Sequence, residues 1–469
     1  MITAGVRIHV IGIAGSGAAG AAILLQRAGA QVDGCDADGP SPYTGPLEAA
    51  GIRWQVGHDP AHLSGVDRVA ITPALRALPH HAELNAAEAA GIPVVTWQAL
   101  LGELMAAPGR IGIGVTGTHG KSTTTALLGH LLTAAGLDPS VEVGAFIPAW
   151  GASVRPGDGR PFVVEADEFG DNFLNYHPAA AIVTNVEMDH PDYFADEAAV
   201  MDSFERFVRG MGSDSDFGRL LLATAGDPGA EELVARLGDW EGRIVRYGPG
   251  GEVAASDVTF TSEGTTFTLF GRRFTSRLAG AHNVLNATAA LALATELGAD
   301  LDHLVDGLAT FAGAGRRMEL IADTPRVTIY DDYGHHPTEV RATIAAARQR
   351  VGTKRRLWAV FEPHMYSRTT LLLDAFSTAF TDADEVVVAD IFASRDTLEA
   401  MAATSAEALA DAIERATGTP AIATGDVDVT TDYLVDHLGD GDAVLVMGAG
   451  KSYRIARGLA ERLAEEAES

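Results

Sequence analysis

Cysteine is almost absent from this 469-residue chain, which carries Cys35 alone. A single thiol excludes an internal disulfide and a cysteine-based zinc cluster, and it suits a reducing cytosol. Long apolar runs are missing as well, because no charge-free stretch reaches the length of a membrane-spanning helix. We therefore expect a cytoplasmic protein with no membrane partner.

Positive charge is also scarce. The chain has 34 Lys and Arg against 63 Asp and Glu, a net charge of −29. This balance argues against nonspecific binding to nucleic acids or anionic membranes, although a local basic pocket for phosphates stays possible. Apolar residues make up 47% of the chain, which fits a globular protein, and the length suggests about two to four domains.

Short β-rich runs alternate with helical periodicity along most of the chain, which is typical of parallel α/β layers. The pattern restarts twice, so we predict three α/β domains, over residues 1–107, 108–315 and 316–469. Residues 257–278 alternate apolar and polar side chains across a Glu-Gly turn, which predicts antiparallel hairpins on the edge of the second α/β layer. The apolar N-terminal segment resembles a signal peptide, but five glycines between residues 12 and 29 favour a strand, a turn and a helix.

A glycine-rich loop lies at residues 111–132, IGIGVTGTHGKSTTTALLGHLL. It follows a predicted buried strand and opens a predicted helix, where backbone N–H groups and the helix N-terminus can hold phosphates. The usual phosphate loop has a glycine at the position of Val115, so this loop departs from the common pattern. Lys121 is predicted to reach the terminal phosphates of ATP and Ser122 to ligate Mg²⁺.

Acidic side chains follow two neighbouring predicted strands. Glu165, Asp167 and Glu168 end one strand, and Asp189 and His190 end the next. Carboxylates at the carboxyl ends of parallel strands point into the ligand crevice, and Mg²⁺ prefers hard oxygen ligands. Beside a phosphate loop, these residues predict a second divalent ion. A solvated acidic loop is the alternative.

Seven motifs follow one another along nearly the whole chain: GVTGTHGKSTTT, EADE, TNVEMDH, AGAHNVLNA, GAGRRME, DDYGHHPTE and FEPHMYSRT. In this order they resemble the motifs of the Mur ligases of peptidoglycan synthesis, and among them those of the alanine-adding branch. The motif GTHGKS marks the superfamily, whereas DYGHHPTE and the pattern PHxYxRT are specific to the alanine-adding branch and its nearest relatives.

The resemblance implies a three-domain architecture: a Rossmann-like domain for the UDP-sugar, a central ATPase-like domain, and a Rossmann-like C-terminal domain that closes over the site. It implies an ATP-dependent ligase that joins L-alanine to UDP-N-acetylmuramate through an acyl phosphate, as a monomer or homodimer. The implied catalytic residues are Lys121, Glu165, His190, His335 and His364. The implied ATP-binding residues are Gly117, Thr118, Gly120, Lys121, Ser122, Thr123, Asn283, Arg317 and Asp332. Ser122, Glu165 and His190 are the implied metal ligands, and Tyr333, His335 and Arg368 the implied amino-acid contacts.

A second glycine loop, GIAGSGAAG at residues 12–20, matches the dinucleotide fingerprint, with Asp36 at the end of the next predicted strand. Alone it predicts an NAD-dependent oxidoreductase. The same geometry accepts any diphosphate, and hydride transfer leaves the ATP-type loop unexplained, so UDP is the favoured ligand. The residues expected near UDP are Gly15, Ser16, Gly17, Asp36 and His58.

Three positions differ from the pattern of the alanine ligases. Met365 replaces a cation in the presumed amino-acid pocket, Ala281 replaces an arginine, and residues 165–173 diverge from the usual acidic motif. A Mur-type ligase for another amino acid, a peptide or another sugar acid therefore stays open. A nucleotide sensor without turnover is the non-enzyme alternative.

Overall fold

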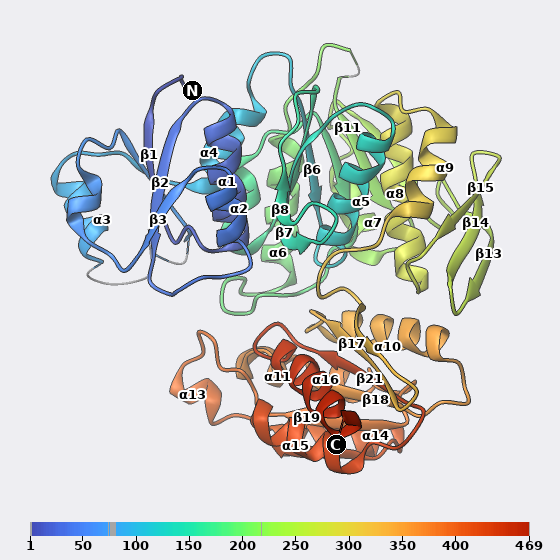
Figure 1. Cartoon of the computed structure of the whole chain (residues 1–469). Helices are drawn as coiled ribbons and strands as arrows, with labels where there is room; N and C mark the ends of the chain where they lie inside the picture. The colour runs from blue at the N-terminus through green and yellow to red at the C-terminus, as the bar shows by residue number, and fades with distance from the viewer. Residues whose placement is uncertain (1, 74, 76–80, 217, 469) are drawn as a thin grey trace.

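The computed structural model describes residues 2–73, 75, 81–216 and 218–468. Four sheets build the chain, and the C-terminal sheet with its helices lies below the other three in Figure 1. The first sheet is parallel, with strand order β3-β2-β1-β4-β5. Its strands are β1 (Arg7–Ile11), β2 (Gln31–Asp36), β3 (Arg53–Val56), β4 (Arg68–Ile71) and β5 (Val94–Thr96). Its helices are α1 (Ser16–Arg27), α2 (Thr44–Ala49), η1 (Pro60–Leu63), α3 (Ala82–Ala89) and α4 (Trp97–Met105).

The second sheet has seven strands in the order β12-β11-β10-β6-β9-β7-β8. All neighbours are parallel except β7 and β8. The strands are β6 (Ile111–Thr116), β7 (Ser140–Ile147), β8 (Ala152–Arg155), β9 (Pro161–Glu165), β10 (Ala180–Val183), β11 (Leu220–Thr224) and β12 (Arg243–Tyr247). The helices of this region are α5 (Lys121–Ala134), η3 (Phe169–Asn175), α6 (Glu197–Arg209), α7 (Pro228–Arg236), α8 (Ala281–Glu296) and α9 (Leu301–Thr310).

The predicted antiparallel hairpins are confirmed. They form a separate three-stranded sheet of β13 (Ser256–Thr261), β14 (Gly264–Leu269) and β15 (Arg272–Ser276). This sheet packs against α8 and α9, at the edge of the central part (Figure 1). Phe267 and Phe274 bury one face of it in the central core, so the hairpins need no pairing with the seven-stranded sheet, whose own antiparallel edge is β8.

The C-terminal sheet has the order β16-β17-β21-β18-β19-β20 and is parallel except for β16. Its strands are β16 (Glu319–Asp323), β17 (Val327–Asp332), β18 (Leu357–Phe361), β19 (Glu385–Ala389), β20 (Ala421–Gly425) and β21 (Asp442–Met447). Its helices are α10 (Pro337–Val351), α11 (Tyr366–Leu371), α12 (Leu373–Ser377), α13 (Leu398–Met401), α14 (Ala406–Thr417), α15 (Val427–His437) and α16 (Tyr453–Glu468).

The apolar cores show which parts pack most closely. One buried cluster runs from Ile8 of β1 through α1 and α4 to Phe204 of α6, so it joins the first sheet to one face of the second. Two other clusters cover the two faces of the C-terminal sheet and include no residue of the first two sheets. The C-terminal part therefore meets the rest mainly through polar contacts. The boundaries near residues 107 and 315 stay a prediction.

The predicted strand, turn and helix at the N-terminus are confirmed by β1 and α1. No helix within the described ranges combines the length and the apolar character that crossing a bilayer requires. The expected cytoplasmic location and the expected monomer or homodimer stay predictions.

Candidate active site

The glycine loop joins β6 to α5 and is tighter than the common pattern. Val115 is fully buried inside β6, so the loop begins only at Gly117. Gly117 has φ +128° and Gly120 has φ +82°, which side chains rarely adopt. A Cβ on Gly117 would lie 2.1 Å from the Thr184 hydroxyl oxygen. The missing glycine at Val115 is therefore no defect, because that position is a strand residue.

The Lys121 ammonium group lies inside this loop. It donates to the carbonyls of Gly117 and Thr118, at 2.8 and 3.2 Å, and to Glu168 Oε2 at 2.8 Å. Burial alone would lower the pKa of Lys121, but Glu168 and Asp167 hold it above its ordinary value. The lysine is thus a fixed positive charge at the helix N-terminus, where both the charge and the helix dipole would stabilise a bound phosphate group.

Two groups of possible metal ligands lie beside the loop. Ser122 donates to Glu165 Oε1 at 2.9 Å, as expected of two ligands of one ion. His190 lies elsewhere: it joins Asp167 and Glu168, with ligand atoms within 4.8 Å of one another. Among the described residues, Glu168 Oε1 and His190 Nδ1 are buried without a hydrogen-bond partner. Both sets have the hard oxygen donors that suit Mg²⁺.

His119 is a loop residue whose importance sequence reasoning missed. Its ring lies between Glu187, 3.6 Å from Nε2, and Glu339 of α10, 3.5 Å from Nδ1. Burial lowers the pKa of His119, but these two carboxylates raise it to about 9. One indication of this contact was present in the sequence: His119 lies in the motif THGKS and Glu187 in the motif NVEMDH. His119 therefore links the phosphate loop to the C-terminal part as a cation.

This ion pair predicts a pH dependence. Because the folded-state pKa of about 9 exceeds the ordinary value of about 6.5, the stabilisation is complete below about pH 6.5 and is lost as the pH rises to about 9. We expect the wild type to lose roughly 3 kcal/mol of unfolding free energy over this window. Denaturant unfolding at several pH values measures it.

The matched control is His119→Gln, which removes the titrating group and should flatten that part of the profile. Glu187, whose pKa the His119 pair lowers to about 2 despite burial, stays ionised throughout the window. Burial and the nearby His119 lower the pKa of His336 to about 4, so this neighbour stays neutral. Equal slopes in the two proteins would contradict the assignment.

The remaining predicted ATP contacts line one cavity between the loop, α8 and α10. Asn283 donates to the Ala279 carbonyl and accepts from Asn286 Nδ2. Asp332 accepts from the backbone N–H groups of Met318 and Gly334, at 2.8 and 2.7 Å. Arg317 stacks on Tyr333 with its guanidinium 5.4 Å from the ring centre. The predicted residues that line this cavity are Gly120, Thr123, Asn283, Arg317 and Asp332.

The C-terminal histidines and Arg368 lie together, next to the metal-ligand group. The rings of His335 and His364 are 5.8 Å apart. Burial and Arg368 lower the pKa of His335 to about 3 and that of His364 to about 4, so both are neutral near pH 7. Arg368 is buried and donates to Asp189 Oδ1 at 2.8 Å, besides its contact with His364. Met365 is buried and has φ +72°. The position at which this chain lacks the cation expected of the alanine-adding branch therefore lies inside the protein.

The first glycine loop lies between β1 and α1. The Ala14 N–H donates to Asp36 Oδ2 at 2.9 Å, so Asp36 holds the loop directly. Ser16 accepts from Ser153 through its carbonyl. A Cβ on Gly17 would lie 2.4 Å from the Trp97 ring, so this glycine also serves packing. His58 instead contacts Glu83 and Cys35, at 3.1 and 3.2 Å.

The central sheet carries a phosphate-type loop. A nucleotide-type α/β unit lies on one side of it, and a third α/β unit makes polar contacts with the loop. This arrangement defines a three-domain nucleotide-dependent enzyme. Three family models match: "Mur ligase family, catalytic domain" over residues 7–108, "Mur ligase middle domain" over 115–294, and "Mur ligase, glutamate ligase domain" over 316–450. The chain belongs to the Mur ligase family.

Two relatives and one solved structure are similar to this chain over nearly their full length. The UDP-N-acetylmuramate–L-alanine ligase of Acidothermus cellulolyticus is 39% identical over 95% of this chain and 92% of its own length. That of Mycolicibacterium vanbaalenii is 39% identical over 95% and 93%. The structure of the UDP-N-acetylmuramate-alanine ligase of Thermotoga maritima has a TM-score of 0.80 at 25% identity, covering 98% of this chain and 99% of that one.

Proposed function

We propose that this protein is an ATP-dependent ligase that joins L-alanine to the carboxylate of UDP-N-acetylmuramate, with Mg²⁺, in the cytoplasm. The observation that carries the proposal is the placement of Lys121. It lies in the phosphate loop beside two groups of metal ligands and a buried Arg-His cluster. The named relatives, which are similar over nearly their full length, support the choice of substrates.

The site suits activation of a carboxylate. A carboxylate does not react with an amine in water until one oxygen becomes a leaving group, so its oxygen attacks the γ-phosphorus of ATP and ADP leaves. The amine then attacks the acyl phosphate carbon, phosphate leaves, and the amine gives up a proton. Lys121 would neutralise charge on the transferred phosphoryl group, a role of positioning and electrostatics.

The ligand sets fit Mg²⁺. Ser122 and Glu165 would hold one ion, and Asp167, Glu168 and His190 a second. Bound Mg²⁺ supplies positive charge to the phosphate oxygens. The unpartnered Glu168 Oε1, which lies 3.9 Å from His190 Nε2, is an atom that such an ion would satisfy.

The C-terminal cluster is proposed to receive the amino acid. His335 and His364 are neutral near pH 7, so either can accept a proton from the amine. Their pKa values of about 3 and about 4 make both of them weak bases. Arg368 could clamp the amino-acid carboxylate only by exchanging its contact with Asp189. Tyr333, partly exposed beside His335, is proposed to border the same place. Gly15, Ser16, Gly17 and Asp36 are proposed to hold the UDP diphosphate, with His58 near the nucleotide.

A phosphate-release assay over UDP-sugars and amino acids, with mass spectrometry of the products, tests the proposal. We expect ADP and phosphate in equal amounts, and an amide product with alanine and UDP-N-acetylmuramate. Removing Mg²⁺ with a chelator should stop release. A better rate with glycine, serine or a peptide would contradict the substrate, and nicotinamide turnover or ATP binding without release would contradict the class.

A further inference from the structure

A further group of possible metal ligands lies in the N-terminal part of the chain, away from the phosphate loop. It comes from four elements: β1, β2, η1 and α3. Its ligand atoms all lie within 4.8 Å of one another. Three of the four side chains are at most 1% exposed and the fourth is 14% exposed. This N-terminal cluster consists of His9, Cys35, His62 and Glu83.

Three of the four distances suit ligands of one ion. Zinc bonds of about 2.0–2.3 Å place the ligands of a tetrahedron roughly 3–4 Å apart. His9 Nε2 is 3.4 Å from Cys35 Sγ and 3.8 Å from Glu83 Oε1, and Cys35 Sγ is 3.1 Å from Glu83 Oε2. His62 Nδ1 and Glu83 Oε1 are 2.6 Å apart, a hydrogen bond that opens when both atoms bind an ion. One sulfur, two imidazole nitrogens and one carboxylate form a donor set typical of zinc.

His9 is oriented as a metal-ligating histidine. Its remote nitrogen, Nδ1, lies 2.7 Å from Asp33 Oδ1, so the proton on Nδ1 is bound there. The Nε2 lone pair then faces Cys35 and Glu83. A carboxylate behind a histidine is the common second contact of zinc ligands, because it sets the tautomer and the ring direction.

A buried negative charge lies at the centre of the cluster. The Glu83 carboxylate accepts from the Asp59 N–H at 3.1 Å and lies 2.6 Å from His62 Nδ1 and 3.1 Å from Cys35 Sγ. Burial would raise the pKa of Glu83, but hydrogen bonds from Cys35, His62 and Asp59 lower it, so the carboxylate stays charged. His9 Nε2 faces the Cys35 thiol, whose one proton Glu83 also attracts. A cation bound by all four groups would bond to His9 Nε2 and neutralise the Glu83 charge.

The geometry points to a structural site for a divalent cation of the Zn²⁺ class, held by the four residues of the N-terminal cluster. Cys35 releases its proton to solvent as the sulfur–metal bond forms. The proton that His62 Nδ1 shares with Glu83 moves to His62 Nε2, which leaves the Nδ1 lone pair free to bind the ion. One cysteine excludes a cluster of several cysteines, but it does not exclude this mixed site. The ion would join β1, β2, η1 and α3 across one face of the sheet.

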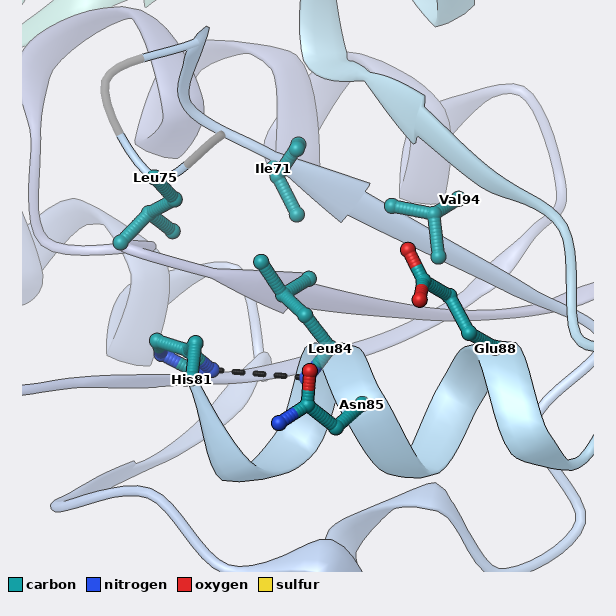
Figure 2. A pocket seen from close by; sticks show the side chains of 7 residues that line it. All are labelled: Ile71, Leu75, His81, Leu84, Asn85, Glu88 and Val94. Atoms are coloured by element: carbon teal, nitrogen blue, oxygen red, sulfur yellow. Dashed lines mark hydrogen bonds between the residues drawn. The ribbon is translucent and has the colours of Figure 1, made fainter. Parts of the chain in front are cut away.

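The site is reachable from solvent. His62 and His58 keep 14% and 22% of their side chains exposed beside Glu83. On the other side, the cavity of Figure 2 is bordered by His81, whose ring lies 4.4 Å from that of His58. His81 Nδ1 accepts from the Leu84 N–H at the start of α3, as the dashed line in Figure 2 shows.

The test uses the full chain, dialysed against Zn²⁺ with excess Mg²⁺ and then against metal-free buffer containing Mg²⁺. We expect one Zn²⁺ per chain by elemental analysis. Co²⁺ in its place should give visible tetrahedral bands and a near-ultraviolet thiolate-to-cobalt band. Cys35→Ser should lose the thiolate band and retain far less Zn²⁺. Asp33→Asn should weaken binding by roughly 10–100-fold while keeping the band.

His190→Ala is the matched control, because it removes a ligand of the group formed with Asp167 and Glu168 and should leave the Zn²⁺ content and the cobalt spectrum unchanged. Thermal unfolding gives a second readout: Zn²⁺ should raise the Tm of the wild type and not that of Cys35→Ser. A cobalt complex without a thiolate band, unchanged retention in Cys35→Ser, or loss of the ion in His190→Ala would overturn the site. None of these readouts depends on ligase activity.

Discussion

Lys121→Ala is expected to abolish phosphate release while the protein still binds the UDP-sugar. The loss should be at least roughly 10²–10³-fold in kcat, as found when one preorganised group that stabilises transition-state charge is removed. The reason is positional: the ammonium group is fixed by two loop carbonyls and Glu168 at the start of α5. A coupled phosphate assay measures release, and calorimetry with the UDP-sugar measures binding.

Lys354→Ala is the control for loss of a lysine, because Lys354 is exposed in the loop after α10. It should keep wild-type turnover. Since Lys121→Ala leaves the buried Glu168 carboxylate without its cation, the double change Lys121→Ala with Glu168→Gln separates folding from function. It should restore the unfolding temperature and not the activity. Substantial phosphate release by Lys121→Ala would show that the ATP site is assigned wrongly.

Arg368→Met is expected to be strongly destabilising and to reduce ligase activity severely. Arg368 and Asp189 are 2% and 6% exposed and lie on different sides of the contact between the C-terminal part and the central sheet. Removing one partner of a buried ion pair costs about 3–5 kcal/mol, because the other charge stays buried and unpaired. Denaturant unfolding and kcat/KM for the amino acid measure the two effects.

A second ion pair across the same contact provides the matched control. Arg395 binds Asp192 at 2.9 Å, but the arginine side chain is 47% exposed. An exposed pair contributes about 0–1 kcal/mol, so Arg395→Met should change the free energy of unfolding little. If Arg368→Met and Arg395→Met lost similar amounts of unfolding free energy, burial would not decide how much an ion pair contributes to stability.

Buried parallel strands can be recognised in the sequence where their apolar run is continuous. β6 and β21 are buried at every position. The largely buried β7 carries Glu142 and Gly144, so no continuous apolar run marks it. Three of the four residues of β3 are exposed and β16 has no buried residue, so neither strand has the apolar pattern of a core strand.

The part of the candidate site that consists of residues close together in the chain could be predicted. Gly117, Gly120, Lys121 and Ser122 are close in the chain, so a strand before them and a helix after them suffice to place their backbone. Their partners are different. Glu168 was visible only as one of several acidic residues, and its ion pair with Lys121 spans 47 positions.

By itself, the amino-acid sequence determined the α/β class, the phosphate loop and the motifs of the Mur ligase family, because short-range periodicity and glycine positions act within a few residues. The tertiary structure decided which distant side chains meet. It placed His119 between Glu187 and Glu339, and it paired Arg368 with Asp189 rather than leaving it free. It also gathered the only cysteine with His9, His62 and Glu83. These contacts join separate strands and helices, and their charges take effect only because folding removes the water around them.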